Sequence, residues 1–249
     1  MKVLFIGDIH GITSWKEPAL NAIKSGTKVV FLGDYVDTHD SNIKPYQIYD
    51  NLVNIIEFKK THPDSVTLLL GNHDYAYVFA KIYTTGFNFH LWWDYRQVIN
   101  DNWDLFDIAW GFQGKNKYTL VTHAGLTSYF YGEIERTIND PTEVLYDILV
   151  DELDKDWKEL PLHELLNYFK DQVRLMWKIG IKRNGDDFTG SIIWADKKEL
   201  CWYNYQGINQ IVGHTNNYYI EMEQVGDDQL FFIDAHYKNN LSPLMLDLI

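Results

Sequence analysis

The sequence predicts an α/β fold: a four-layer αββα sandwich in which two mixed sheets pack face to face between helices, with a helical cap insertion. Strands and helices alternate in the first third of the chain, an order that is typical of a right-handed, mostly parallel sheet. From Ile208 onward the pattern changes to short strands at 218–225, 230–233 and 244–248, which we interpret as an antiparallel meander. Two sheets of different character are therefore expected.

The first sheet is expected to begin near residue 3. Its strands are short apolar runs rich in β-branched and leucine side chains, which is the composition of strands buried on both faces. They lie at 3–6, 29–32 and 66–70. Helices are expected between them, at 15–24 and 45–60, and Pro45 suits the first turn of the second helix because a helix leaves that N–H without a partner.

A helical segment is expected in the second half of the chain. Apolar residues recur at three- and four-residue steps between 140 and 179. Because this stretch separates two of the motifs described below, we expect residues from about 126 to 190 to form a helical cap beside a cleft. The chain is 46% apolar, enough for one large core, so residues 1–249 are expected to be a single domain.

Charge and cysteine content exclude several functional classes. The formal net charge is -13, which repels the phosphate backbone of extended DNA or RNA. The single cysteine, Cys201, excludes an intrachain disulfide and indicates a reducing compartment. No apolar run is long enough for a signal peptide or a membrane span, so we expect a cytoplasmic protein. The composition does not predict an oligomeric state.

Short polar motifs follow the apolar runs. They are GDIHG at 7–11, GDYVD at 33–37, GNHD at 71–74, HAG at 123–125 and GHT at 213–215. Each lies where a predicted strand ends, and loops at the carboxyl edge of an open α/β sheet are where ligands usually bind. A single such motif is ordinary turn chemistry, but their ordered recurrence predicts one shared site.

The motifs offer ligands for two metal ions. The candidates are Asp8, His10, Asp34, Asn72, His123 and His214. Mixed oxygen and imidazole donors suit Mn, Fe, Zn or Co better than Ca, and one carboxylate can bridge two ions. Two ions about 3.5 to 4 Å apart can share a hydroxide that attacks phosphorus in line. His73 follows Asn72 and faces the same cleft, where Asp37 can hold its ring as a proton donor.

The motif series resembles that of the calcineurin-like metallophosphoesterases. Within them it is similar to the phosphoprotein Ser/Thr phosphatases and to bacterial diadenosine tetraphosphatase. The resemblance implies a first metal held by Asp8, His10 and Asp34, and a second held by Asp34 with Asn72, His123 and His214. It also implies that His73 is the general acid and Asp37 its orienting partner.

Two features depart from the family pattern. Thr38 stands where the family has an arginine that clamps a substrate phosphate, and Tyr75 stands where many protein phosphatases have a basic residue. The GNHD and HAG spellings resemble the dinucleoside tetraphosphatases, whereas GHT resembles the protein phosphatases. We expect Arg183 to supply the missing cation, with Lys182 or Arg174 as alternatives.

Further residues are candidates for the substrate site. They are His39 after the second motif, His236 in the last loop, and Trp194 and Asp196 in the segment before it. A surface or packing role remains the alternative for both histidines. A cluster of Trp92, Trp93, Trp103 and Trp110 can stack a nucleobase, although packing is its default interpretation.

The sequence therefore predicts a metallophosphoesterase with a dinuclear centre, in which a metal-bridging hydroxide attacks a phosphate monoester. We expect a protein Ser/Thr phosphatase acting on a phosphorylated protein. A hydrolase or phosphodiesterase of diadenosine polyphosphates or other small nucleotide substrates is the alternative, followed by a non-catalytic scaffold. The expected cofactors are two divalent ions, manganese first, with Fe, Zn, Co or Ni as alternatives. Neither extended nucleic acid nor a membrane is an expected partner.

Overall fold

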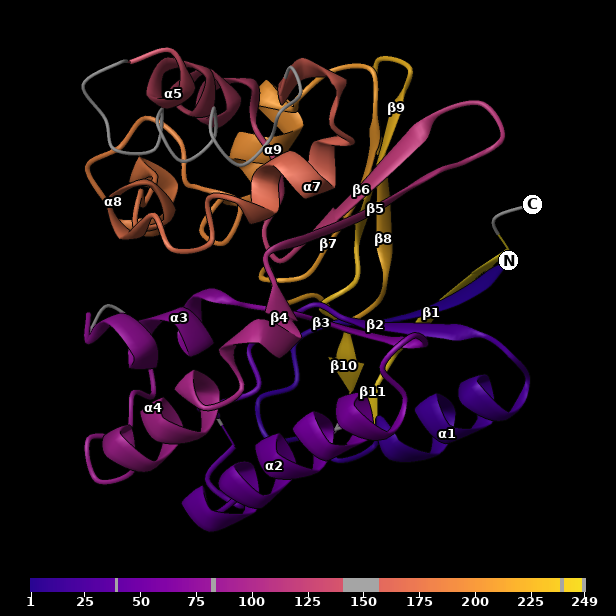
Figure 1. The fold of residues 1–249 in the computed structure, drawn as a ribbon, viewed down its shortest axis with the longest axis vertical. Coiled ribbons are helices and arrows are strands. Elements are labelled where there is room, and N and C mark those ends of the chain that lie inside the picture. The colour runs from indigo at the N-terminus through magenta and orange to yellow at the C-terminus, as the bar shows by residue number, and fades with distance from the viewer. Residues whose placement is uncertain (39, 82–83, 141–156, 238–239, 248–249) are drawn as a thin grey trace.

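The protein contains two five-stranded sheets that lie between layers of helices in a computed structural model (Figure 1). The structure describes residues 1–249 except 39, 82–83, 141–156, 238–239 and 248–249. In Figure 1 one set of helices lies below the first sheet and another lies beside the second sheet. The predicted α/β sandwich of two mixed sheets flanked by helices is confirmed.

The first sheet has the strand order β12-β1-β2-β3-β4. Its strands are β1 (Lys2–Ile6), β2 (Lys28–Phe31), β3 (Val66–Leu69), β4 (Phe106–Asp107) and β12 (Leu244–Asp247). From β1 to β4 neighbouring strands are parallel, whereas β12 runs antiparallel to β1. The connections contain α1 (Lys16–Lys24), α2 (Pro45–Thr61), α3 (Asn72–Phe79), α4 (Trp92–Asn100) and the 3-10 turn η1 (Trp103–Leu105). The predicted strand and helix order of this region is confirmed.

The second sheet has the order β5-β6-β7-β9-β8. Its strands are β5 (Ala109–Gln113), β6 (Tyr118–Thr122), β7 (Asn209–Val212), β8 (Glu221–Val225) and β9 (Asp228–Phe232). Between β6 and β7 the described chain forms α5 (Ser128–Ile138), η2 (Trp157–Glu159), α7 (Leu162–Asn167), α8 (Val173–Met176), η3 (Ile181–Arg183) and α9 (Lys197–Tyr203). A short hairpin of β10 (His236–Tyr237) and β11 (Asn240–Leu241) precedes β12.

The predicted antiparallel meander after Ile208 is wrong. Within the second sheet, β8 and β9 form the one antiparallel pair among the described strands after Ile208, since β7 and β9 are parallel neighbours and β8 lies at the edge of the sheet. The last strand, β12, joins the first sheet. An alternating apolar pattern specifies which face of a strand is buried but not which neighbour it pairs with, so periodicity could not distinguish these topologies.

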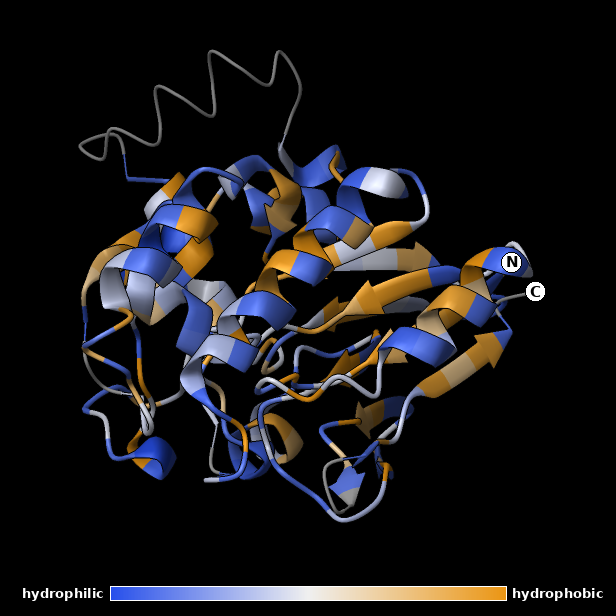
Figure 2. Ribbon diagram, turned by 90° about the horizontal axis from the view of Figure 1, so that it is seen from below, coloured by the Kyte–Doolittle hydropathy of each residue, from blue (hydrophilic) through white to orange (hydrophobic). Residues whose placement is uncertain are grey.

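Apolar side chains fill the space between the sheets and the space under the helices. In β1, Val3 and Phe5 belong to the cluster between the sheets, while Leu4 and Ile6 pack with the helices. Successive strand residues point to opposite faces, so a strand buried on both faces is apolar throughout. Figure 2 shows the same division: the strands are largely orange, and the outer helices carry both orange and blue residues.

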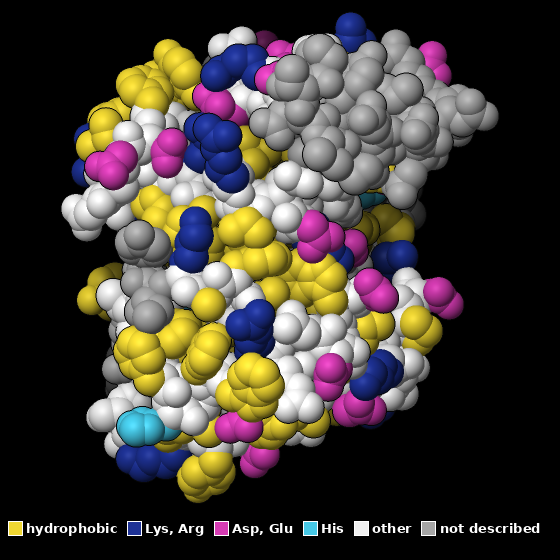
Figure 3. Space-filling model, turned by 60° about the vertical axis from the view of Figure 1, so that its left-hand side comes forward, with side chains coloured by type: hydrophobic (Ala, Val, Ile, Leu, Met, Phe, Trp, Pro, Cys, Tyr) yellow, Lys and Arg dark blue, Asp and Glu magenta, His cyan; other side chains and the backbone are white. Residues whose placement is uncertain are grey.

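The surface carries charges of both signs. On the face shown in Figure 3, Lys and Arg side chains are separated by acidic and hydrophobic ones, and the described residues of this face form no continuous basic stripe. No helix in the described part of the chain combines the length and apolar character that a bilayer crossing requires.

Candidate metal centre

The predicted motifs meet at one place, where the loops after the central strands of both sheets converge. The backbone N–H groups of Ile9 and His10 donate to the carbonyl oxygen of Asp34, at 3.2 and 2.7 Å, and so join the first two motif loops. The converging loops enclose a cavity of about 580 Å³. Its lining includes Asp8, His10, Asp34, Asn72, His73 and His214.

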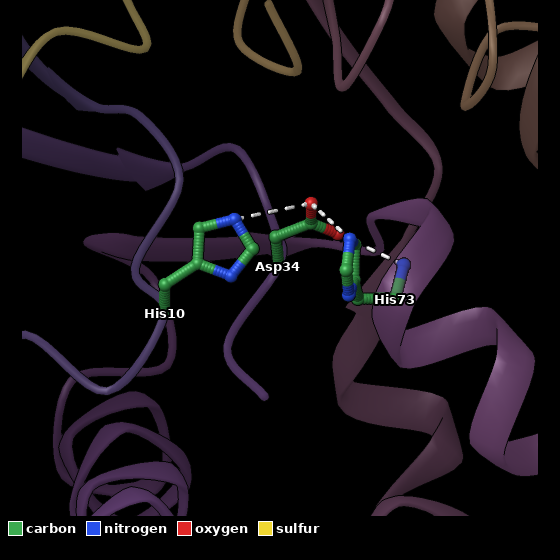
Figure 4. A group of neighbouring side chains, drawn as sticks. All are labelled: His10, Asp34 and His73. Carbon is green, nitrogen blue, oxygen red and sulfur yellow. Dashed lines mark hydrogen bonds and ion pairs between the residues drawn. The ribbon is translucent and has the colours of Figure 1, made fainter. Parts of the chain in front are cut away.

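Asp34 lies at the centre of the cluster. Its Oδ2 atom is 3.7 Å from His10 Nε2 and 3.5 Å from His123 Nε2. Figure 4 shows the Asp34 carboxylate between the rings of His10 and His73. Ligands of one ion at about 2.1 Å lie about 3 to 3.5 Å apart, so these separations are close to those of a coordination shell. Asp34 belongs to both groups of side chains that can hold a metal ion, and thus has the position of a bridging ligand.

Backbone carbonyls set the orientation of two histidines. His10 Nδ1 donates to the carbonyl of Val36 at 3.2 Å, and His123 Nδ1 donates to that of Leu32 at 2.8 Å. In each ring the proton is therefore on Nδ1, and Nε2 faces the carboxylates as a lone pair. This is the usual arrangement of metal-binding histidines, in which the second ring nitrogen is tied to a carbonyl or carboxylate.

Electrostatics indicates that a cation belongs among these groups. Burial, and then the nearby Asp234, raises the pKa of Asp8 well above its ordinary value. Burial, and then the charge of Asp8, does the same for the pKa of Asp34. Ionised carboxylates packed this closely repel one another unless a positive charge lies between them.

The imidazoles of the second group are neutral and are candidate metal ligands. Burial lowers the pKa of His123 to about 3, and burial followed by Arg183 lowers that of His214. The lone pair of His123 Nε2 faces Asn72 Oδ1 at 3.0 Å, and His214 Nδ1 lies 3.1 Å from the same nitrogen. These atoms carry lone pairs that face one another at short distance, and a divalent metal ion between them would accept all of those lone pairs.

Strained backbone presents the site residues. His10, Asp34, Asp37 and His214 all have positive φ, from 43° to 61°. Non-glycine residues rarely adopt this conformation, and it persists where the surroundings hold it. Part of the support comes from Asp74, whose carboxylate accepts from the backbone N–H groups of Asp34 at 2.8 Å and of Gly71 at 2.9 Å.

Two glycines allow the carboxylates to lie against the backbone. A Cβ atom at Gly71 would lie 2.0 Å from Asp34 Oδ1, and one at Gly213 would lie 2.2 Å from Asp8 Oδ1. Any side chain at either position would displace a candidate ligand. The glycines that begin the GNHD and GHT motifs are therefore part of the site.

His73 and Asp37 form a hydrogen-bonded pair beside the cluster. His73 Nδ1 is 2.8 Å from Asp37 Oδ2, and His73 Nε2 is 3.9 Å from Asp34 Oδ2. His73, not Asp8, forms a group of possible ligand atoms with His10 and Asp34, so distance alone permits it to be a ligand. The hydrogen bond to Asp37 and the position of His73 at the cavity wall are equally consistent with a second role, that of a proton donor.

Comparison with known proteins identifies the family. The profile of the calcineurin-like phosphoesterases matches residues 1–218. The chain belongs to this family. It is therefore a metal-dependent hydrolase of phosphate esters, as the motif series predicted. A search of curated proteins gave no match.

The solved structures that match the chain include two of low sequence identity. One is a protein serine/threonine phosphatase from Saccharomyces cerevisiae with similarity to human phosphatase PP5, at 18% identity and TM-score 0.44. That match covers 97% of this chain and 70% of the yeast chain. Another is a hypothetical protein from Pyrococcus horikoshii, at 10% identity and TM-score 0.43, covering 99% of this chain and 87% of the other.

Basic residues of η3 line the same cavity of the phosphoesterase. Arg183 Nε lies 3.1 Å from Asp196 Oδ2, and an Arg183 NH2 group donates to Thr215 Oγ1 at 2.7 Å. Lys182 and Trp194 also line the cavity. Arg174, by contrast, lines a separate cavity, together with Glu133 and Arg136 among others. Of the three cations considered from the sequence, two are at the site and Arg174 is not.

Some of the remaining residues that the sequence suggested for the substrate site line the cavity, and others do not. His236 lines the cavity of the phosphoesterase and contacts the Asn216 amide at 2.5 Å. His39 lies outside the described residues. The tryptophans of the proposed stacking cluster are absent from the cavity lining. Trp93 is 64% exposed, and the other three are occupied in packing. Trp92 Nε1 donates to a backbone carbonyl, Trp103 Nε1 donates to Asp171, and Trp110 packs on Phe5 and Phe112.

Sequence reasoning gave no role to several residues at the site. Asp74 is the last residue of the GNHD motif, and its carboxylate joins two motif loops. Asp234 is buried at the cavity, where burial raises its pKa to about 7. Thr84 is also buried there, and its hydroxyl has no hydrogen-bond partner among the described residues. Asp74 lies inside a motif and could have been found from it, but the other two follow no spacing signal.

Proposed function

We propose that this phosphoesterase uses two divalent metal ions to hydrolyse phosphate monoesters, and that its substrates are phosphoserine and phosphothreonine side chains. The observation that carries the proposal is the shared position of Asp34, which belongs to both groups of ligand atoms. A single metal would not require a carboxylate between two sets of imidazoles. The first ion is assigned to Asp8, His10 and Asp34, and the second to Asp34, Asn72, His123 and His214.

Each side chain at the cavity then has a chemical task. When bound, the ions supply an activated water as nucleophile and neutralise charge on the phosphoryl oxygens. Asp34 keeps the two ligand sets in register, since its backbone is fixed by Asp74. His73 donates the proton on Nε2 to the leaving oxygen of the ester, while Asp37 accepts from Nδ1 and stabilises the charged ring.

Arg183 is the proposed contact for the substrate phosphate. Thr38, at the position of the family's arginine, has only a neutral hydroxyl, which accepts from the backbone N–H of Asp40 at 3.1 Å. Arg183 presents a planar set of donors to the cavity and is oriented by Asp196 and Thr215. The clamp has thus moved from the second motif to η3, with Lys182 adding a second positive charge.

The choice of monoesters over dinucleotides rests on the cavity lining. A nucleoside polyphosphate needs an apolar surface for its base in addition to the phosphate site. Among the described residues the tryptophans suggested for that purpose lie outside this lining, and Trp194 is the tryptophan that lines the cavity. The GNHD and HAG spellings still favour the dinucleoside alternative, which the assay below includes.

One set of assays tests the proposal. Metal-free protein is reconstituted with manganese, and bound metal is counted before activity is measured on a phosphoserine peptide, diadenosine tetraphosphate and bis(p-nitrophenyl) phosphate. We expect two ions per chain and the highest kcat/KM on the peptide. Preference for diadenosine tetraphosphate would replace the protein phosphatase by the nucleotide hydrolase, and a protein that binds no metal would be a scaffold. Parallel loading with Fe, Co, Ni and Zn ranks the metals.

A further inference from the structure

The carboxylate that orients His73 has a second hydrogen-bond partner, which no motif contains. Tyr77 donates its hydroxyl proton to Asp37 Oδ1 at 2.5 Å, while His73 Nδ1 occupies Asp37 Oδ2 at 2.8 Å. Both oxygens of the carboxylate are therefore bound, one on each side. A carboxylate held at both oxygens cannot rotate, and so it fixes the plane in which the His73 ring is held.

The direction of the Tyr77 bond follows from its other contact. The backbone N–H of Asn88 donates to the Tyr77 oxygen at 2.7 Å, so the hydroxyl hydrogen is left to point at Asp37. An ionised carboxylate only accepts hydrogen bonds, and a bond from a neutral donor to a charged acceptor is among the stronger kinds. Burial and the Asp37 charge raise the pKa of Tyr77, which keeps the donor protonated.

Neighbouring aromatic side chains hold the Tyr77 ring in a single position. Its side chain is fully buried, with the Phe87 ring stacked on it at 4.3 Å between centroids and the Tyr95 ring edge-on at 5.0 Å. Tyr77 follows His73 by four residues in α3, which places the two side chains on the same face of the helix. Helix geometry and aromatic packing thus align the hydroxyl with the carboxylate before any substrate arrives.

We propose that Tyr77 is a positioning residue for the proton donor: its hydroxyl holds the Asp37 carboxylate in the orientation that directs His73 at the leaving oxygen. This rests on the proposed function, because it assumes that His73 protonates the leaving group. General acids act only when their proton is aligned with the reacting atom, so a small rotation of the ring lowers the rate.

The test compares two substrates with different needs for a proton. Tyr77→Phe removes the hydroxyl and keeps the ring. We expect kcat on an alkyl phosphate such as glycerol 2-phosphate to fall about tenfold and kcat on p-nitrophenyl phosphate to fall less than about twofold, with KM unchanged on both. Equal losses on the two substrates, or no loss on the alkyl phosphate, would overturn the proposal.

Tyr95→Phe is the matched control. Tyr95 is also fully buried and packs against Tyr77, but its hydroxyl donates to the carbonyl of Pro45 at 3.1 Å. Its loss is expected to change neither rate by more than about twofold. If Tyr95→Phe reproduces the substrate-dependent loss, the effect belongs to the aromatic cluster and the assignment to Tyr77 is overturned.

A double variant shows whether Tyr77 acts through His73. In a His73→Asn background the added Tyr77→Phe change is expected to slow alkyl phosphate hydrolysis by less than about twofold, because the group it positions is gone. If Tyr77→Phe slows alkyl phosphate hydrolysis by the same factor in the His73→Asn background as in the wild type, the proposal is overturned.

Nuclear magnetic resonance of the metal-free protein separates this inference from the proposed function. The Nδ1 proton of His73 is assigned by its loss in His73→Asn, and we expect its resonance to move or broaden in Tyr77→Phe and to stay in place in Tyr95→Phe. An unchanged resonance in Tyr77→Phe overturns the inference. A wild-type protein that hydrolyses neither ester contradicts the proposed function, while the resonance still shows whether Tyr77 holds Asp37.

Discussion

The floor and the rim of the cavity are built in different ways. On the floor, Asp8, Asp34, Asn72 and His123 each expose at most 2% of their surface. Backbone groups fix several of these side chains, such as the N–H of His214 that donates to Asp8. On the rim, the Arg183 side chain is 27% exposed and is held by two side-chain contacts, to Asp196 and Thr215.

This difference separates chemistry from selectivity. A floor fixed by backbone and burial holds ligands in one geometry, which a metal centre requires. A rim held by side-chain contacts can change its residues without disturbing that geometry. The ligand residues of the family pattern are thus kept on the floor, while the proposed phosphate clamp, Arg183, lies on the rim rather than at position 38. Variants of floor and rim should then fail in different ways.

The largest effect is expected at the floor, from Asp34→Asn. Removing the charge shared by both ligand sets should release both ions and lower kcat at least about 1,000-fold. Metal content after dialysis and kcat on p-nitrophenyl phosphate measure the two losses. Asp50→Asn, at an exposed aspartate of α2, is the control and should keep full metal content. Two ions retained in Asp34→Asn would show that the floor does not depend on its central carboxylate.

His73, between floor and rim, should give the next largest effect. His73→Asn removes the proton donor, so kcat on an alkyl phosphate should fall about 100-fold and kcat on p-nitrophenyl phosphate less than about tenfold. Metal content is expected to stay the same. Loss of one ion would instead assign His73 to the floor as a ligand, and equal losses on both substrates would remove its role as an acid.

At the rim, Arg183→Ala should lower kcat/KM about tenfold on every phosphate ester, mainly through KM, with both ions retained. Arg183→Lys should recover part of the loss. Arg174→Ala is the matched control, because Arg174 lines a different cavity. If KM and kcat are unchanged in Arg183→Ala for all esters, the clamp lies elsewhere on the rim.

The smallest expected effect is a pH dependence of the stabilisation that metal gives to the floor. The pKa of Asp8 and of Asp34 is raised well above 3.8 in the folded metal-free protein, so that state holds more protons than the unfolded chain. Their contribution to stability is thus greatest in acid and is lost as the pH rises through the raised pKa values. Because metal replaces these protons, the rise in Tm on adding manganese should be a few degrees larger at about pH 8 than at about pH 5.5. Calorimetry at both values measures it, and a rise independent of pH would contradict the cation assignment.

Much of the fold could be predicted because local signals were strong. Strands such as Val3 to Ile6 are apolar on both faces, and Pro45 marks the start of α2 as expected. The order of the last strands could not be predicted. The pairing of β7 with β9, and of β12 with β1, depends on which sheet edge is open in space, and residue periodicity does not contain that information.

In the site, too, the residues that follow a local sequence signal could be predicted, and those that depend on long-range contacts could not. Asp8, His10, Asp34 and Asn72 could be placed because each follows a buried strand within a few residues, and the structure brings them together. Tyr77 and Asp234 could not, since their positions at the site depend on contacts between distant segments. The proposed clamp is intermediate. The sequence alone shows that position 38 lacks the arginine, but only the structure shows that Lys182 and Arg183 line this cavity and Arg174 another.

The positive φ angles of His10, Asp34, Asp37 and His214 have a consequence for engineering. Each left-handed non-glycine residue costs about 1 to 2 kcal/mol, which glycine would recover. A library selected for thermal tolerance alone will therefore enrich glycine at these positions and discard the candidate metal ligands and the carboxylate that binds His73. Selection of hardier variants of this protein should be coupled to turnover in every round, or the strained positions should be held constant.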